Sequence, residues 1–242
     1  MSDRLSRLRT TISRRHLGVE ALESRALLAA TPTIRLCECA DTGVKDDGIT
    51  YAATPRFKGT ATPRAQLTLA LDGGATLGLA RANAFGEWEF TARKVRVPDG
   101  IQTIRITEKG PDGSPTGTAT TTVTFDRAKP TASITRDGNT FSVDFSQAVT
   151  GFNGELNGLV LSGRPIGSRP FTVALSSQRV RAMLGDIQFT PQPNGTTYVI
   201  QILGQPIPAG TYTLRLNAMR SGIMASVSGA RLTANMTYTF TV

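Results

Sequence analysis

Hydrophobic and polar residues alternate with a period of two along many short stretches of the chain after residue 33. In residues 66–71, with the sequence Q-L-T-L-A-L, three leucines at alternate positions lie on one side of an extended strand. The same alternation recurs at 101–107, 118–125, 140–145, 197–203, 211–216 and 238–242. This period is typical of strands with one buried face, so the pattern predicts β-structure from residue 34 onward.

Turn-forming residues separate these stretches. Segments rich in Gly, Pro, Asp and Asn stand at 72–74, 98–100, 110–113, 137–138, 153–154 and 194–195. Many short strands with turns at this spacing predict β-sandwiches. The segment D-R-A-K-P at 126–130 interrupts the pattern, which then restarts, and it predicts a linker. The expected fold class is all-β, with tandem sandwich domains at 34–129 and 130–242.

The first 33 residues lack this alternation. Residues 1–16 are basic and unpatterned, which predicts disorder. Residues 17–29 place leucine and alanine at mixed helical spacing, and they predict a short helix that ends before Pro32. The expected N-terminal segment, 1–33, is therefore partly disordered or helical.

The sequence L-E-S-R-A-L-L within that segment follows the pattern L-E-x-R-x-L-L. The matching residues are Leu22, Glu23, Arg25, Leu27 and Leu28. They resemble the LEPR-XLL segment at the N-termini of large bacterial extracellular and surface proteins, with Ser24 in place of the proline of that pattern. The resemblance implies a targeting role and an extracellular or cell-surface location. The alternative is a frayed helix without such a role.

The first predicted sandwich carries a series of motifs in order. They are D-T-G at 41–43, D-D-G-I-T at 46–50, T-P-x-F-x-G-T-A at 54–61, G-x-W-x-F at 86–90 and D-G at 99–100. In this order and spacing they resemble the bacterial Ig-like repeats of adhesins and biofilm proteins. Trp88 and Phe90 lie on one strand face and are expected to anchor the core.

The second predicted sandwich has motifs of its own. They are V-x-F-S-x-x-V-T-G-F at 143–152, G-T-Y-T-L at 210–214 and S-G-I at 221–223. They resemble an Ig-like domain of bacterial surface proteins and S-layer-associated chains. Ala225 and Gly229-Ala230 stand where that family often has an Asp followed by Gly-Asn. The two resemblances together imply two tandem Ig-like β-sandwiches.

The charge of the chain bears on its partners. The 242 residues are 39% hydrophobic and carry a formal net charge of +9. No apolar run approaches the roughly 18 residues needed to span a bilayer. Arg93-Lys94-x-Arg96 is a local basic cluster, but no nucleic-acid-binding motif accompanies it, so nucleic acid is not an expected partner. With Arg179 and Arg181, these residues form the candidate site for a carbohydrate or another polyanion.

The sequence offers little for catalysis. His16 is the only histidine, and it lies in the N-terminal segment, so a Ser-His-Asp or Cys-His arrangement lacks its base within either sandwich. Ligands for a zinc hydrolase and a phosphate-binding glycine motif are also missing from the sequence. We therefore expect a protein that is not an enzyme and that requires no cofactor. A hydrolase of unrecognised type is the weakest alternative.

Calcium is the ligand that the sequence motivates best. Asp41, Asp46 and Asp47 crowd one loop, and hard cations bind several oxygen ligands. The resemblance to adhesin repeats implies calcium at such loops and at joints between repeats, where Asp126 stands. Lys45 lies inside the acidic group and argues against a site. The alternative is a solvated acidic turn.

Cys37 and Cys39 are the only cysteines. On an extended strand, positions i and i+2 lie near the upper limit of disulfide reach. The spacing therefore favours two reduced or peripheral thiols. The alternatives are pairing with another molecule and a strained, labile bridge.

These observations favour a non-enzymatic bacterial protein of the cell surface or a secreted matrix, acting in adhesion or as a structural spacer. The expected partners are surface polysaccharides or other surface proteins, and the oligomeric state is left open. The alternative function is a carbohydrate- or polyanion-binding module that uses the basic surface.

Overall fold

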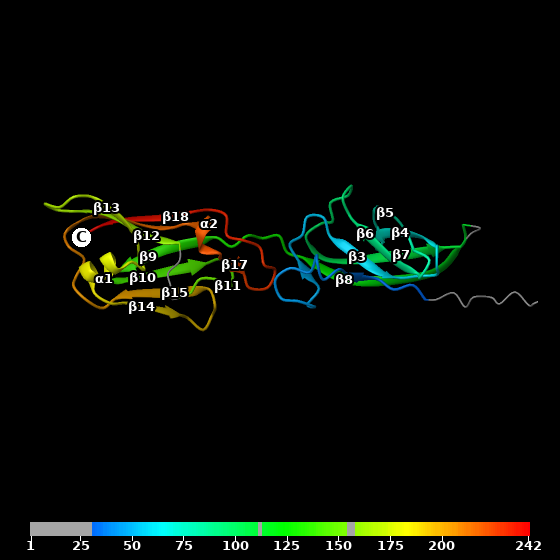
Figure 1. Ribbon diagram of the computed structural model, residues 1–242, viewed down its shortest axis with the longest axis horizontal. Helices are drawn as coiled ribbons and strands as arrows, with labels where there is room; N and C mark the ends of the chain where they lie inside the picture. The colour runs from blue at the N-terminus through cyan, green and yellow to red at the C-terminus, as the bar shows by residue number, and fades with distance from the viewer. Residues whose placement is uncertain (1–30, 111–112, 154–157) are drawn as a thin grey trace, which may run out of the picture.

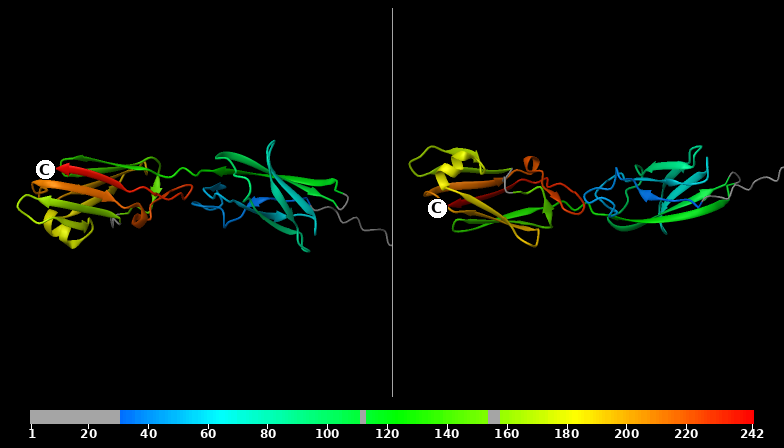
Figure 2. Two further views of the ribbon diagram at one scale, coloured as in Figure 1. Left: turned by 90° about the horizontal axis from the view of Figure 1, so that it is seen from above. Right: turned by 60° about the horizontal axis from the view of Figure 1, so that its bottom comes forward.

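The computed structural model describes residues 31–110, 113–153 and 158–242 of the chain (Figure 1). The fold is all-β, as predicted, and consists of two Ig-like β-sandwiches that follow each other along the long axis of the molecule (Figures 1 and 2). The predicted N-terminal helix and the LEPR-XLL-like segment lie outside the described residues. Within the described residues, no helix is long and apolar enough to cross a membrane.

The first sandwich pairs a three-stranded sheet with a five-stranded sheet. The smaller sheet has the order β1 (Arg35–Leu36), β3 (Arg56–Thr60), β6 (Glu87–Thr91). The larger sheet has the order β2 (Ile49–Thr50), β8 (Pro115–Phe125), β7 (Gly100–Lys109), β4 (Gln66–Leu71), β5 (Thr76–Arg81). Strands β2 and β8 run parallel, and the other pairs are antiparallel.

The core of the first sandwich forms from the alternate positions that the sequence indicates. Leu67 and Leu69 of β4 are fully buried. Trp88 of β6 is 3% exposed, and its indole N–H donates to the Thr60 carbonyl oxygen at 3.2 Å, so its polar atom is satisfied on burial. Phe90 packs against the same cluster. The prediction that Trp88 and Phe90 anchor this core is confirmed.

The second sandwich has two four-stranded sheets and one small ladder. One sheet has the order β14 (Ile187–Pro191), β15 (Thr197–Ile202), β10 (Thr140–Phe145), β9 (Ala132–Asp137). The other has the order β13 (Phe171–Ala174), β12 (Leu159–Pro165), β16 (Gly210–Leu216), β18 (Met236–Thr241). Strands β11 (Val149–Thr150) and β17 (Met224–Ala225) pair separately.

Tyr212 of β16 fixes one corner of the second core. Its side chain is 1% exposed and stacks on Phe240, with 5.5 Å between ring centroids. Its hydroxyl donates to the carbonyl oxygen of Pro208, four residues upstream, at 2.7 Å. This backward hydrogen bond has the geometry of the tyrosine corner found in Ig-type sandwiches.

Two short helices correct the expectation of β-structure throughout. In α1 (Gln178–Leu184), the Ser177 side chain accepts a hydrogen bond from the Val180 N–H, and Gly185 with φ of 81° ends the helix. Val180 and Leu184 are buried at a spacing of four residues, which a helix places on one face. The second helix, α2 (Ala218–Ser221), is a single turn capped by Asn217. Strand β18 ends at Thr241, and Val242, the last residue of the alternating stretch at 238–242, is exposed.

Candidate functional site at the joint between the sandwiches

Arg127 fastens the linker to the first sandwich. Its guanidinium donates to the carbonyl oxygens of Ala52 at 3.0 Å and Val97 at 3.1 Å, and it also pairs with Asp99. The same group lies over the Phe125 ring, 5.0 Å from its centroid. The Arg127 side chain is only 12% exposed, so these bonds form in a desolvated setting where they are stronger than at an open surface.

The other end of the linker is fastened to the second sandwich. The Gln147 side-chain amide donates to the Ala128 carbonyl oxygen at 3.0 Å. Thr131 and Ser146 exchange two bonds: the Thr131 N–H donates to the Ser146 hydroxyl, and the Ser146 N–H donates to the Thr131 carbonyl oxygen, both at 3.0 Å. The linker is therefore hydrogen-bonded to the first sandwich at one end and to the second sandwich at the other.

Two loops far apart in the sequence form a second connection. In Figures 1 and 2 a loop from the N-terminal part of the first sandwich lies beside a loop that precedes β18. The Thr42 hydroxyl donates to the Ser228 carbonyl oxygen at 2.7 Å, and the Val44 N–H donates to the Val227 carbonyl oxygen at 3.2 Å. We call the two connections, the linker and this loop pair, the joint.

Two glycines allow the loops to approach. Gly43 has φ of 77°, and a Cβ atom there would lie 1.9 Å from the Val227 carbonyl oxygen. Gly229 has φ of 74°, and a Cβ atom there would lie 2.8 Å from the Gly43 nitrogen. Any side chain at Gly43 would push the loops apart, so the contact depends on the bare backbone.

Buried polar residues support the loop from the first sandwich. Thr50 is fully buried, and its hydroxyl donates to the Ala40 carbonyl oxygen at 2.6 Å. Ser228 is also fully buried, and Asp41 is 5% exposed. Polar groups are rarely buried unless hydrogen bonds or ligands satisfy them. The loops at the joint are therefore held by buried polar contacts as well as by packing.

The four predicted calcium ligands make separate local hydrogen bonds. Three of them accept through their carboxylates, and Asp46 donates through its main-chain N–H. The Asp41 carboxylate accepts from the Asp46 N–H at 2.6 Å, and its other oxygen is buried without a hydrogen-bond partner. Asp47 accepts from the Ile49 N–H at 2.8 Å. Asp126 accepts from the Ala128 N–H at 3.1 Å within the linker. Among the described residues, no three His, Cys, Asp or Glu side chains are grouped to hold a metal ion.

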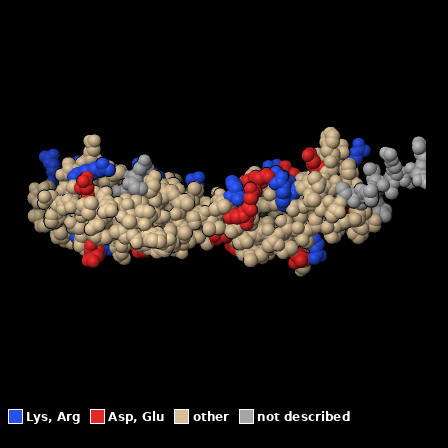
Figure 3. All heavy atoms as spheres, turned by 90° about the horizontal axis from the view of Figure 1, so that it is seen from below, with Lys and Arg blue, Asp and Glu red and all other residues tan. Residues whose placement is uncertain are grey.

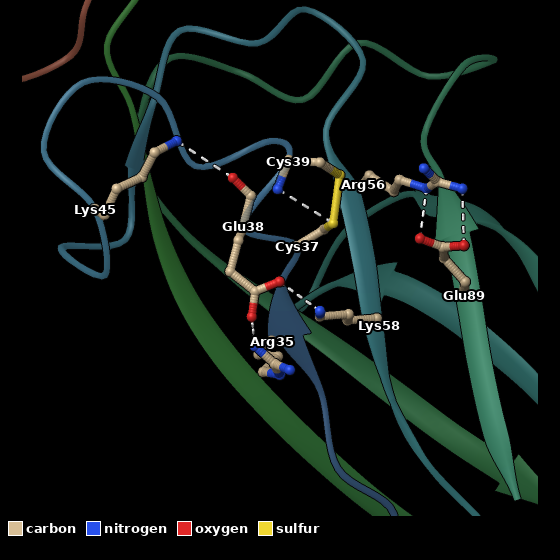
Figure 4. A network of polar contacts seen from close by, with 8 residues as sticks. All are labelled: Arg35, Cys37, Glu38, Cys39, Lys45, Arg56, Lys58 and Glu89. Atoms are coloured by element: carbon tan, nitrogen blue, oxygen red, sulfur yellow. Dashed lines mark hydrogen bonds and ion pairs between the residues drawn. A yellow bond between two sulfur atoms is a disulfide. The ribbon is translucent and has the colours of Figure 1, made fainter.

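Lys45 lies in the acidic loop and binds main-chain oxygens near it. Its ammonium donates to the main-chain carbonyl oxygens of Asp41 and, at 3.3 Å, of Glu38 (Figure 4). A positive charge of the chain itself thus binds carbonyl oxygens of the kind that calcium also binds. This arrangement gives the acidic loop a counter-charge of its own.

Cys37 and Cys39 form a disulfide (Figure 4), so the prediction that favoured two reduced or peripheral thiols is wrong, and the chain forms the direct bridge that was an alternative to it. The prediction assumed an extended chain. The chain instead turns directly after β1, with the Ala40 N–H donating to the Cys37 carbonyl oxygen at 2.8 Å. The turn brings the two Cα atoms to 5.1 Å, well within disulfide reach.

Glu38, between the two cysteines, is the centre of an ion-pair network. Its carboxylate pairs with Lys58 and with Arg35 (Figure 4). Hydrogen bonds from Lys58, then from Arg35, lower the pKa of Glu38 from 4.5 to about 2. The carboxylate is therefore ionised throughout the physiological range.

The basic candidates for polyanion binding fall into two separate groups. Arg93, Lys94 and Arg96 are exposed between β6 and β7, and Arg96 lies 3.9 Å from Asp99. Arg179 and Arg181 are exposed on α1 of the second sandwich, at the end away from the joint (Figure 1). Figure 3 shows acidic and basic groups side by side over the first sandwich, which is a mixed surface. The structure does not bring the two basic groups together.

The sequence indicated part of the joint and missed part of it. It placed Asp126 at the joint, but it placed the acidic loop only at the start of the first sandwich and did not indicate its contact with the second. It missed Arg127, Thr42 and Ser228, because a bond between residues 186 positions apart leaves no local pattern. The run D-R-A-K-P shows an arginine in the linker, and arginine carries five N–H donors, but nothing in the run indicates the carbonyl groups that Arg127 binds.

The end-to-end sandwiches, the tyrosine corner and the braced joint define an Ig-like β-sandwich protein. A family model described as a bacterial Ig-like domain matches residues 28–127. A comparison with curated protein sequences found no match.

Solved structures also resemble the chain. The BSP domain of a biofilm-associated protein is 17% identical with a TM-score of 0.28, and the match covers 78% of this chain and 27% of that one. Dimeric latent PorU from Porphyromonas gingivalis is 16% identical with a TM-score of 0.30, and the match covers 86% of this chain and 20% of that one. A titin A168–A169 structure is 12% identical with a TM-score of 0.28, and the match covers 88% of this chain and 98% of that one. The chain spans about a quarter of the first and a fifth of the second.

Proposed function

We propose that the protein is a spacer of the bacterial cell surface or a secreted matrix, which holds adhesive partners apart at a fixed distance and carries no enzymatic activity. The observation that carries the proposal is the joint. Arg127 fastens the linker on one side, and the contact between Thr42 and Ser228 braces the other. Two connections across one boundary restrict bending, which a single flexible linker would allow.

The family match supports the bacterial setting of this function. The first sandwich matches a bacterial Ig-like domain model. The LEPR-XLL-like segment and the S-layer-associated type of the second sandwich remain predictions, and they support export to the surface. The proposed partners are surface polysaccharides or other surface proteins, which would contact loops and sheet edges exposed along the spacer.

Cell fractionation tests the proposed location. The full chain is produced in its own bacterium and compared with a variant that lacks residues 1–30. We expect the full chain in the surface or medium fraction and accessible to added protease. The deletion variant should remain inside the cell while its purified form keeps the circular dichroism of the full chain. A full chain found only in the cytoplasm would contradict the proposal.

We also propose that calcium binds at the joint, on the basis of one observation. The unpartnered Asp41 oxygen is buried, and a buried carboxylate oxygen needs a donor or a cation. Millimolar calcium should raise the melting temperature of the wild-type chain and leave that of Asp41→Asn unchanged. Lys45→Met should strengthen the response, because the ammonium competes for the same carbonyl oxygens. An equal response to magnesium, or none to calcium, would refute a calcium site.

A further inference from the structure

The disulfide between Cys37 and Cys39 is asymmetric in its accessibility. Cys37 is 7% exposed and lies against the first sandwich, whereas Cys39 is exposed on the turn. We therefore expect a thiolate that approaches from solvent to reach Cys39 more readily than Cys37. Thiol–disulfide exchange depends on which sulfur is attacked and on access to it.

The buried sulfur has a donor that suits a leaving thiolate. The Cys39 N–H donates to the Cys37 sulfur at 3.3 Å. The ammonium groups of Lys45 and Lys58 and the guanidinium of Arg35 lie around the same turn (Figure 4). Lys58 and Arg35 pair with Glu38, and Lys45 lies in the acidic loop, so the Cys39 N–H is the direct donor to the leaving sulfur. An N–H donor favours a thiolate, and a stabilised leaving thiolate departs faster.

The turn does not depend on the disulfide for its shape. The N–H groups of Ala40 and Asp41 both donate to the Cys37 carbonyl oxygen, at 2.8 and 3.0 Å. The Cys37 N–H donates to the Arg56 carbonyl oxygen at 2.8 Å, which ties the turn to β3. A bridge across one intervening residue also removes little entropy from the unfolded chain. The disulfide can therefore open while the sandwich stays folded.

We propose that this turn is a site of thiol–disulfide exchange that attaches a thiol-bearing partner to Cys39. The incoming thiolate attacks the Cys39 sulfur, the bond between Cys37 and Cys39 breaks, and a new disulfide joins Cys39 to the partner. The electron pair of the broken bond leaves on Cys37 as a thiolate. The step needs no added oxidant, because one disulfide replaces another. It does not rest on the proposed spacer function.

The partner is identified by its chemistry as a free thiol. A low-molecular-mass thiol and an exposed cysteine of a surface protein present the same reacting group. Unlike a buried structural bridge, this disulfide has one cysteine, Cys39, exposed on a surface turn. We therefore expect both sources to react, and the experiment has one arm for each.

Mapping of the mixed disulfide tests the proposal on the folded, full chain. The oxidised protein is treated at pH 8 with reduced glutathione in one arm and a cysteine-containing peptide in the other. Iodoacetamide then traps free thiols before peptide mass spectrometry. We expect the added thiol on Cys39 and the alkyl group on Cys37, with Cys39 favoured at least about tenfold because of its access. Modification mainly at Cys37, or reaction only after unfolding, would overturn the proposal.

Two serine variants provide a matched comparison in the reverse direction. Cys37→Ser leaves the exposed thiol, and Cys39→Ser leaves the buried one. With oxidised glutathione, Cys37→Ser should form a stable mixed disulfide at least about tenfold faster than Cys39→Ser. Circular dichroism of both variants checks that the fold is retained. Equal rates in folded variants would contradict the assigned asymmetry, and the wild-type mapping remains decisive if either variant fails to fold.

Discussion

The hydroxyl of Thr42 donates a hydrogen bond of 2.7 Å to the main-chain carbonyl oxygen of Ser228, and with the bond from the Val44 N–H to the Val227 carbonyl oxygen it joins the two sandwiches outside the linker. The two loops contact each other mainly through main-chain atoms and not through buried apolar side chains. Val44 and Val227, the two large apolar residues of the loops, are 52% and 46% exposed. The stiffness of the joint must therefore come from hydrogen bonds and close backbone fit, which single substitutions can remove without harming either core.

Gly43→Ala should loosen the joint. The new Cβ atom would meet the Val227 carbonyl oxygen, so the two loops must separate. We expect a broader distribution of inter-sandwich distances by small-angle X-ray scattering. NMR relaxation should also give the two sandwiches less similar rotational correlation times.

Gly73→Ala is the matched control for that variant. Gly73 has φ of 69°, close to that of Gly43, but no atom lies within 4 Å of a Cβ placed there. Both variants carry the same cost of about 1–2 kcal/mol for a left-handed alanine. Only Gly43→Ala should change the scattering profile. Equal profiles for the two variants would show that the loop contact does not restrict bending.

Arg127→Met should destabilise the first sandwich and free the linker. The substitution removes charged hydrogen bonds to the carbonyl oxygens of Ala52 and Val97, and it leaves those oxygens without this donor. We expect a loss of about 2–3 kcal/mol in the free energy of unfolding. The chain has a single tryptophan, Trp88 in the first sandwich, so urea unfolding followed by its fluorescence reports this sandwich alone.

Arg105→Met is the comparison for Arg127. Arg105 pairs with Asp72 on the surface, where both side chains are nearly half exposed. Exposed pairs contribute at most about 1 kcal/mol, so this variant should unfold close to the wild type. A loss as large as that of Arg127→Met would mean that burial of the linker arginine has no special importance.

Tyr212→Phe tests the corner of the second sandwich. The variant keeps the ring and removes the hydroxyl that donates to Pro208, so the free energy of unfolding should fall by about 1–2 kcal/mol. Differential scanning calorimetry measures the change. Tyr238→Phe, which alters a partly buried ring on β18, should shift the transition much less. A larger effect at Tyr238 would argue against a tyrosine corner.

The strands were predictable because their signal is local, and the joint was not. Leu67 and Leu69 alternate with polar residues, and this period alone places them in a core. The bond between Thr42 and Ser228 depends on how two complete sandwiches meet, which no short window of sequence contains. The disulfide shows the same limit, because the inference from spacing assumed a strand where the chain forms a turn. Lys45 was visible inside the acidic loop, but its carbonyl partners were not.

Acid should remove the contribution of Glu38 to stability. Its pKa in the folded state is about 2, below the 4.5 of the free group, so the stabilisation is present in full above pH 4.5 and is lost as the pH falls toward 2. Glu38→Gln cannot ionise, and its melting temperature should lie below that of the wild type at pH 7 by a small amount that vanishes near pH 2. The difference should also shrink in 1 M salt, because the network is exposed and salt screens it. A difference that stays constant from pH 7 to pH 2 would show that glutamine disturbs the turn itself and that the ion pairs with Lys58 and Arg35 contribute nothing.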